Sequence, residues 1–345
     1  MRPFSEMLNC LGIDLGSSYV HIYYRRKPVL AEDSVAAVEH TGGQLLGFGT
    51  NALILYHKDP ENVRLIRPIR HGAIANYEAT KSLLRFFINK AIHHSVSKPN
   101  IVVSVPSGIS SVTRHALADA LMHAGAQRVF LMPAPAAAAI GSNKDLTIPS
   151  ALFSLVIGKD VSDAGIYSCG GIVAQKHIAW GGRDIDLGIC QYIKNKYNVV
   201  IVPDAAEKIK KEKISYQSTS EESFTVRGRR INDGVEVIIE LTFQEMSLLV
   251  QRLSHPLVEL IRYVLQRVSP EMAGDLLTNG ILLSGGSAGF QGIQNWLSSV
   301  SGMPVFIADD LENVIAKGCF QSFENRDALS LILEDGGKYY GGIKF

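Results

Sequence analysis

Three short glycine turns, each following an apolar run typical of a strand, are the segments of this sequence best suited to binding chemistry. They span residues 14–18, 157–162 and 284–289. Glycine lets backbone N–H groups approach phosphate oxygens because it has no Cβ to block them. One such turn is weak evidence, since most are plain hairpin turns. Three of them at strand ends are expected of a nucleotide held between two lobes.

The first of these turns also carries side chains that suit phosphate and metal binding. Asp14 is placed to hold a metal-bound water, while Ser17 and Ser18 can donate hydrogen bonds to phosphate. Magnesium fits such a site because it keeps several waters and takes few protein carboxylates. The alternative is that Asp14 only accepts hydrogen bonds from amides of its own turn.

Two of the turns belong to a pattern that occurs twice along the chain. Residues 11–30 predict a strand, a glycine turn, a second strand, a polar turn and a third strand, and residues 152–178 repeat this order. Short β-rich runs bounded by Gly and Ser are hairpin signals. The repeat predicts two lobes built on one plan, unless two unrelated hairpins merely look alike.

The segments between the hairpins alternate between helical and strand patterns. Apolar spacing predicts helices over residues 76–94, 111–124, 136–140, 204–213 and 242–268, and strands over 101–106, 129–132, 224–241 (a hairpin) and 281–284. Gly125 is placed to end the second helix, and Thr242 to cap the last, with Glu245 at the capping-box position. The fold class is therefore α/β. No low-complexity linker separates the halves, so the lobes should pack together around a cleft.

Composition excludes several other classes of protein. At about 150 residues per domain, a chain of 345 residues predicts two domains. Lys plus Arg is 34 and Asp plus Glu is 33, so the net charge of +1 excludes nucleic acid as the main ligand. The four cysteines form no C-x-x-C pair, which predicts reduced thiols in the cytoplasm. Neither a membrane-spanning run of about 18 apolar residues nor a secretory signal is expected.

Several motifs, taken in order, resemble those of the MreB/Mbl family of bacterial actin-like rod-shape proteins. The resemblance runs in register from about residue 11 to 320. It implies an actin-like fold of two lobes, shared with sugar kinases and chaperone ATPases, with ATP in the cleft between them and assembly into protofilaments. Its motifs occupy residues 12–18, 66–75, 105–109, 135–141, 181–186, 206–210 and 280–288.

The resemblance also implies domain boundaries. Lobe I is expected to comprise residues 1–146 and 316–345, with a small subdomain at about 31–64. Lobe II is expected to comprise residues 147–315, with a small subdomain at about 181–240.

By position, the resemblance assigns four groups of nucleotide-binding residues and the cofactor ATP. The residues of the first turn themselves predict Mg²⁺, held through water on Asp14. Without the resemblance, residues 207–212 would be a solvated charged helix face. The assigned residues are Asp14, Gly16, Ser17, Ser18 and Tyr19 in the first phosphate loop, Gly158, Lys159 and Asp160 in the second, Glu207, Lys208 and Lys210 on the ribose and adenine helix, and Gly285, Gly286, Ser287 and Ala288 in the adenosine loop.

Two positions depart from the family where hydrolysis would need acids. Ala134 stands where the family has a catalytic Glu, and Val156 stands where its second phosphate loop begins with Asp. Losing one general base typically costs about 10²–10⁴ in rate, so the chain is at most a weak ATPase.

The second phosphate loop departs from the family as well. Lys159 and Asp160 replace glycines that allow positive φ, which predicts a different loop geometry. Either ATP still binds, with Lys159 pairing phosphate charge in place of a metal, or the site is vestigial.

These observations predict an ATP-binding cytoskeletal filament subunit or scaffold in cell-shape determination, with impaired or absent hydrolysis. The alternatives are a phosphotransferase or competent ATPase of the same fold, and a monomeric pseudo-ATPase adaptor of a membrane-associated complex. Expected partners are further copies of the chain, a paralogous MreB-like protein and membrane proteins of cell-wall morphogenesis.

The N-terminus is a candidate membrane anchor. Its apolar residues fall at helical spacing and predict a short amphipathic helix on the inner face of the cell membrane, unless this segment is an ordinary lead-in to a strand. These residues are Met1, Phe4, Met7, Leu8 and Leu11.

Overall fold

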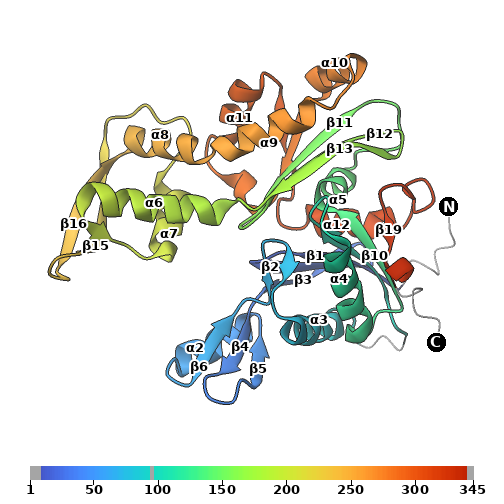
Figure 1. Cartoon of the computed structure of the whole chain (residues 1–345), viewed down its shortest axis with the longest axis horizontal. Helices are drawn as coiled ribbons and strands as arrows, with labels where there is room; N and C mark the ends of the chain where they lie inside the picture. Colours follow the sequence, from blue (N-terminus) through green and yellow to red (C-terminus); the bar gives the residue numbers. More distant parts are fainter. Residues whose placement is uncertain (1–8, 94–96, 340–345) are drawn as a thin grey trace.

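A computed structural model describes residues 9–93 and 97–339, which form two halves with a central sheet in each (Figure 1). The first sheet has six strands in the order β19-β10-β9-β1-β2-β3. β1 to β3 form an antiparallel meander, and β1 also pairs in parallel with β9. The strands are β1 (Cys10–Leu15), β2 (Tyr19–Tyr24), β3 (Lys27–Asp33), β9 (Asn100–Val105), β10 (Arg128–Pro133) and β19 (Glu334–Asp335).

The second sheet repeats this plan with five strands in the order β13-β12-β11-β17-β18. Here too the first three strands form an antiparallel meander, and the first of them pairs in parallel with a later strand. The predicted repeat of the hairpin openings is therefore confirmed. The strands are β11 (Leu152–Ile157), β12 (Ser162–Ser168), β13 (Gly171–Ile178), β17 (Ile281–Ser284) and β18 (Val305–Ile307).

Each half extends into a smaller arm on the left of Figure 1. One arm holds β4 (Ala36–Glu39), β5 (Leu45–Phe48), β6 (Val63–Ile66) and α2 (Thr50–Lys58). The other holds β14 (Val199–Val200), β15 (Ser223–Arg230) and β16 (Glu236–Thr242), with α6 (Gly182–Tyr197), α7 (Pro203–Lys213) and α8 (Phe243–Leu253). A two-stranded sheet, β7 (Ile69–Arg70) and β8 (Ala73–Ile74), follows the first arm.

Side-chain caps and glycines set the helix ends near the predicted positions. The Asn76 side chain accepts from the Ala79 N–H at the start of α3 (Tyr77–Ala91). α4 (Ser111–Ala124) ends at Gly125, whose φ of 116° is one that glycine tolerates. The remaining helices are α5 (Ala134–Gly141), α9 (His255–Leu265), α10 (Pro270–Asn279), α11 (Ile293–Ser301), α12 (Val314–Ser322), η1 (Gly286–Gly289) and η2 (Gly336–Tyr339).

The prediction of one helix over residues 242–268 is wrong, because α8 and α9 are separate helices. Pro256 lies in the first turn of α9, where its ring would clash with the carbonyl of an uninterrupted helix. The Thr242 hydroxyl does accept from the Glu245 N–H, at 3.1 Å. The Glu245 carboxylate, however, accepts from the Tyr192 hydroxyl at 2.5 Å and pairs with Lys196 at 2.7 Å.

Two short helices, α5 and α12, join the halves through an unusually close crossing. α12 packs on β1 and α5, and α5 packs on β11. A Cβ built on Gly141 would lie 1.9 Å from the Val314 carbonyl oxygen, and one on Gly318 would lie 1.7 Å from that of Ala137. The alanine-rich stretch of α5 therefore serves close helix packing.

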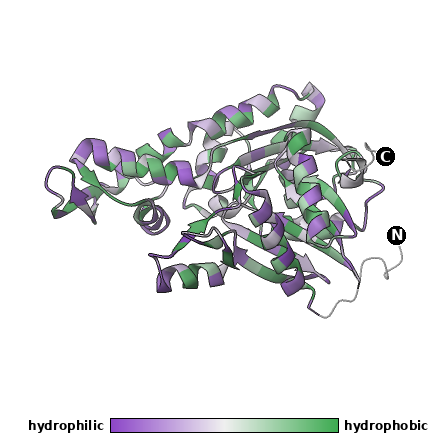
Figure 2. Cartoon of the chain, turned by 60° about the horizontal axis from the view of Figure 1, so that its bottom comes forward, coloured by the Kyte–Doolittle hydropathy of each residue, from purple (hydrophilic) through white to green (hydrophobic). Residues whose placement is uncertain are grey.

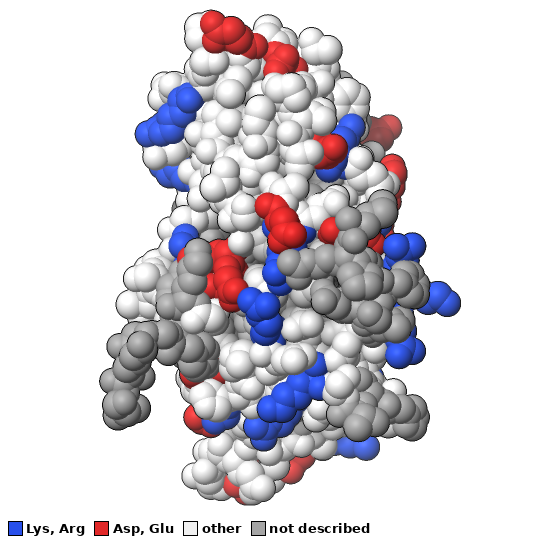
Figure 3. Space-filling view, turned by 90° about the vertical axis from the view of Figure 1, so that its right-hand side faces the viewer, with Lys and Arg blue, Asp and Glu red and all other residues white. Residues whose placement is uncertain are grey.

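The outer helices are amphipathic (Figure 2), and the surface carries both basic and acidic side chains (Figure 3). Hydrophobic and hydrophilic residues alternate along the outer helices (Figure 2). On the face shown in Figure 3, basic and acidic side chains are interspersed.

Within residues 9–93 and 97–339, no helix is long and apolar enough to cross a membrane. All four cysteines are free. Of the residues predicted to form an amphipathic helix, Met1, Phe4, Met7 and Leu8 lie outside the described residues. Leu11 lies in strand β1, paired with Tyr24 and Ile101, so the prediction of a helix is wrong at this residue.

Candidate functional site

The first two glycine turns share one hydrogen-bonding geometry, in line with the repeat of the two meanders. The Gly16 N–H donates to the Tyr19 carbonyl at 3.0 Å, and the Gly158 N–H donates to the Val161 carbonyl at 2.9 Å. Space is tight at both glycines, because a Cβ would lie 2.8 Å and 3.0 Å, respectively, from the same carbonyl oxygens. The two predicted phosphate loops are therefore equivalent turns, one in each half.

Two segments of the second half, the start of α6 and η1, converge on the carbonyl of Gly158. This oxygen accepts from the Gly182 N–H at the start of α6 and from the Ser287 hydroxyl in η1, both at 3.0 Å. Gly285, with φ of 89°, lies so close to β11 that a Cβ would be 2.6 Å from the Ile157 oxygen. Gly286 is exposed and has open space where a Cβ would stand. This arrangement fits a loop whose backbone approaches a ligand.

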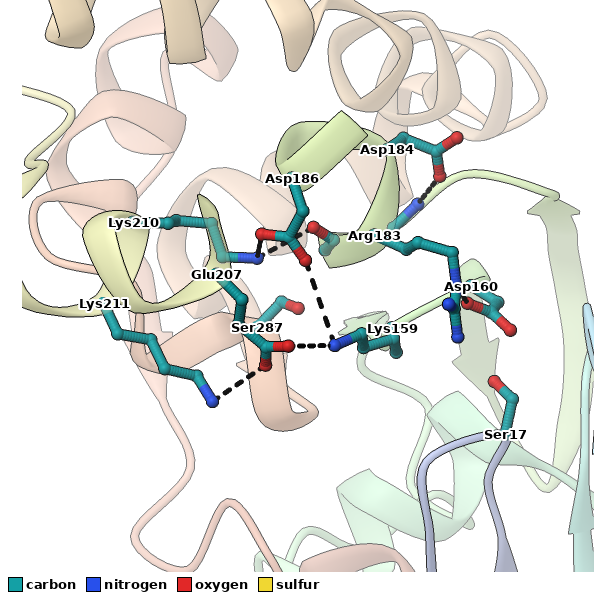
Figure 4. Close-up of polar contacts among 12 residues, drawn as sticks. Ser17, Lys159, Asp160, Arg183, Asp184, Asp186, Glu207, Lys210, Lys211 and Ser287 are labelled. Atoms are coloured by element: carbon teal, nitrogen blue, oxygen red, sulfur yellow. Dashed lines mark hydrogen bonds and ion pairs between the residues drawn. The ribbon is translucent and has the colours of Figure 1, made fainter. Parts of the chain in front are cut away.

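Lys159, predicted to pair with phosphate, is directed toward carboxylates of the second half (Figure 4). Its Nζ forms an ion pair with Glu207 and lies 3.9 Å from Asp186. Lys211 pairs with the other oxygen of Glu207 at 2.9 Å. Burial alone would raise the pKa of Glu207, but Lys159 and Lys211 have the larger effect and lower it to about 2. Glu207 is thus a permanent carboxylate held between two lysines.

Lys210 is buried, and its contacts fasten α7 to α6. Its Nζ lies 2.5 Å from Asp186 and donates to the Gly182 carbonyl at 2.8 Å. Burial lowers the pKa of Lys210, although the Asp186 carboxylate acts in the opposite direction. These contacts support a role in positioning Gly182 and leave a direct contact of Lys210 with nucleotide as a prediction.

Asp160 lies at the junction of the two halves. Its side chain is 3% exposed, and its Oδ1 accepts from Arg183 Nε at 2.6 Å. Ser17, from the first half, faces it in Figure 4. Burial would raise the pKa of Asp160, but the Arg183 guanidinium and the Ser17 hydroxyl outweigh burial and lower it. Neither Lys159 nor Asp160 is among the described residues with positive φ, so the turn forms without that conformation.

The candidate metal residue, Asp14, lies at the end of β1 and is partly exposed. Its Oδ1 accepts from the Ser104 hydroxyl at 2.6 Å, and burial raises its pKa. No cluster of three or more His, Cys, Asp and Glu side chains suited to a metal is found among the described residues. A water-mediated metal contact at Asp14 stays a prediction.

The two positions where acids were expected lie in apolar surroundings. Val156 is 7% exposed and belongs to the same core cluster as Met132 and Leu282, and Ala134 packs against that cluster. A methyl or isopropyl group cannot accept a proton from water. This part of the site is therefore built as hydrophobic core.

The other assigned residues differ in their exposure. Tyr19 is 53% exposed, Lys208 is exposed, Ser18 and Ser287 are partly exposed, and Ala288 is buried. The backbone carbonyl of Ser17 accepts from Arg67 at 3.2 Å.

Sequence reasoning did not single out a second contact between the halves, made by Asp163, Ser107 and His177. The Ser107 N–H donates to Asp163 Oδ2 at 2.7 Å, and the Ser107 carbonyl lies 2.5 Å from His177 Nδ1. Burial raises the pKa of Asp163 to about 8. Ser107 falls in the motif at residues 105–109, but no sequence pattern connects it with Asp163 in β12. Arg183 and Asp186 were likewise missed as individuals, although both fall in the motif at residues 181–186.

Comparison of the sequence with known proteins identifies the family. The family model for the MreB/Mbl protein matches residues 8–331. The cell shape-determining protein Mbl of Bacillus cereus is 33% identical over 322 residues, covering 92% of this chain and 97% of that protein.

Solved structures agree. The AMPPNP-bound crystal structure of MreB 5 of Spiroplasma citri superposes with a TM-score of 0.84 at 26% identity, covering 92% of this chain and 96% of that one. The MamK double helical filament, at 18% identity, covers 91% of this chain and 98% of that one with a TM-score of 0.76, which supports the fold. The predicted actin-like two-lobed fold is thereby confirmed, and the chain belongs to the MreB/Mbl family of actin-like cell shape-determining proteins.

Proposed function

We propose that this chain is a cytoskeletal subunit that binds adenine nucleotide between its two lobes, assembles end to end into protofilaments, and hydrolyses ATP slowly or not at all. The observation that carries the proposal is the contrast between two parts of one site. At Gly158, one carbonyl oxygen accepts hydrogen bonds from both α6 and η1, so the predicted binding loops are held together. At the positions of the two acids, by contrast, Val156 belongs to an apolar cluster and Ala134 packs against it.

Nucleotide binding is supported by the geometry of the turns and by the structural relative. Gly16 and Gly158 form equivalent turns at corresponding strand ends, and Gly285 allows the η1 backbone to meet β11. MreB 5 of Spiroplasma citri, which superposes over 92% of the chain, was crystallised with AMPPNP, and also with ADP. The adenine side of the site would be formed by α7 and η1, and the phosphate side by the two glycine turns.

Slow hydrolysis follows from the chemistry of the replaced acids. A general base accepts a proton from the attacking water, and a positioned base typically contributes about 10²–10⁴ in rate. Ala134 and Val156 supply neither a base nor a ligand for metal-bound water. Assembly is the expected activity that remains, because in this family filament formation is expected to follow nucleotide-bound closure of the lobes, while hydrolysis serves turnover.

The test combines titration calorimetry of the purified chain with a phosphate-release assay. We expect adenine nucleotide to bind and phosphate release to be at least about 10²-fold slower than in a relative that retains both acids. The double variant Ala134→Glu, Val156→Asp shows whether restoring the acids restores turnover. Absence of nucleotide binding would contradict the first half of the proposal. Phosphate release at the rate of the intact relative would contradict the second.

A further inference from the structure

The Asp160 carboxylate lies between the groups that would otherwise receive an anion at the boundary of the two halves. It accepts from Arg183 Nε at 2.6 Å, and the Ser17 hydroxyl faces it from the first glycine turn (Figure 4). Only 3% of the side chain is exposed. Arg183 lies in the first turn of the 16-residue helix α6, where the helix dipole also favours negative charge.

This carboxylate is charged at neutral pH. Burial acts to raise the pKa of Asp160, but Arg183, Ser17 and, more weakly, the charge of His71 lower it below its usual value. Arg183 and Ser17 therefore already interact with an anion of the chain itself, the Asp160 carboxylate.

The lysine next to Asp160 does not offset this charge. The Nζ of Lys159 is paired with Glu207 and lies 3.9 Å from Asp186, both in the second half. The acidic side chain beside the first turn, Asp14 near the end of β1, does not offset it either. A third phosphate placed between the turns would thus meet the buried Asp160 carboxylate. It would have to displace this carboxylate from Arg183 and Ser17.

We propose that Asp160 occupies the place of a terminal phosphate, so that the site binds adenine nucleotides with two phosphates in preference to those with three. This inference rests on the proposed nucleotide site and names the class of ligand that fits it. The Asp160 side chain supplies the contact between the halves that a terminal phosphate would otherwise make through Ser17 and Arg183. Closure of the two lobes then does not depend on a triphosphate.

Titration calorimetry with ADP, ATP and adenosine, in magnesium-containing buffer, tests the proposal on the full chain. Because like charges brought together at an interface are strongly unfavourable, wild-type protein should bind ADP at least about tenfold more tightly than ATP. Asp160→Asn keeps the shape and removes the charge, so ATP affinity should rise about tenfold while ADP affinity changes much less. The matched control is Asp233→Asn, because Asp233 is an exposed carboxylate in the turn between β15 and β16. This change should leave the ratio of ADP affinity to ATP affinity as in the wild type.

Equal affinities for ATP and ADP in the wild type, or tighter binding of ATP, would overturn the inference whether or not the Asn variant folds. So would a folded Asp160→Asn protein with the wild-type ratio of affinities. These results leave the proposed function standing. If neither ADP, ATP nor adenosine binds the wild-type chain, the proposed nucleotide site itself is wrong, and the inference fails with it.

Discussion

The direction of the Lys159 side chain changes what this residue is expected to do. Its position in the second glycine turn made it a candidate partner for phosphate, but its ammonium group is paired with Glu207. Glu207 is held in turn by Lys211 at 2.9 Å. Lys159 therefore joins the turn to α7, and its charge is neutralised within the second half.

This geometry predicts that Lys159→Met affects the binding of ATP and adenosine by the same factor. Removing the lysine loosens α7 but takes no charge away from the phosphates. Calorimetry with both ligands measures the two affinities, and Lys213→Met, at an exposed position at the end of α7, is the control. A loss of ATP affinity of about tenfold with adenosine unchanged would instead show that Lys159 contacts phosphate.

Asp163 is a buried residue whose carboxyl group forms part of the contact between the halves. Its Oδ2 accepts from the Ser107 N–H at 2.7 Å, its Oδ1 has no hydrogen-bond partner within the described residues, and burial raises its pKa to about 8. The pKa of an Asp side chain in the unfolded chain is about 4. Between these values the folded state holds a proton that the unfolded state has released. Stability therefore falls as the pH rises through this window and levels off above about 8.

Asp163→Asn should remove this pH dependence, because the amide is neutral throughout. Urea unfolding at about pH 6 and about pH 8 should show the wild type losing up to about 1.4 kcal/mol per pH unit relative to the variant. His177, on the neighbouring strand, is present in both proteins, so the comparison isolates Asp163. Parallel pH profiles for the two proteins would contradict the assignment.

At the scale of elements, the crossing of α5 and α12 is the packing contact most sensitive to added volume. Gly141→Ala or Gly318→Ala would place a methyl group within 2 Å of a backbone oxygen. Since backbone must move to admit it, each change should lower the free energy of unfolding by at least about 2 kcal/mol. Denaturant unfolding measures the loss.

Gly274→Ala in α10 is the matched control for this prediction, because a Cβ there would meet no atom within 4 Å. Alanine is the better helix former, so this change should stabilise the chain by up to about 1 kcal/mol. If the crossing variants behaved like Gly274→Ala, the helices would be less closely packed than we describe.

The sequence predicted the elements better than it predicted their contacts. The β-rich runs bounded by Gly and Ser, the apolar spacing of residues 76–94 and Gly125 are local signals, and they correctly placed the meanders, α3 and α4. The break between α8 and α9 was also signalled locally, by Pro256, but the apolar period concealed it.

The contacts of the site could not be predicted in the same way. The junction at Gly158 joins residues far apart in the chain, and the direction of Lys159 depends on where Glu207 lies in space. No short-range pattern encodes such distances. The resemblance to a known family supplied the positions of the loops, whereas the ion pairs around them became visible only in the structure.

At the scale of the whole molecule, the two halves repeat one sheet plan and meet at the crossing of α5 and α12 and at polar contacts beside it. Asp160 faces Ser17, and Asp163 holds the Ser107 amide. The chain itself supplies both contacts, which favours a closed arrangement of the lobes. A subunit of this kind should assemble even though it lacks the acids for hydrolysis, and its filaments should be long-lived because hydrolysis does not drive their turnover.

Electron microscopy of the purified full chain, over a series of concentrations with and without adenine nucleotide, tests this account most directly. We expect end-to-end filaments that persist after prolonged incubation with ATP. Single particles at every concentration and with every nucleotide, together with background levels in a pelleting assay, would contradict the account and favour a monomeric adaptor.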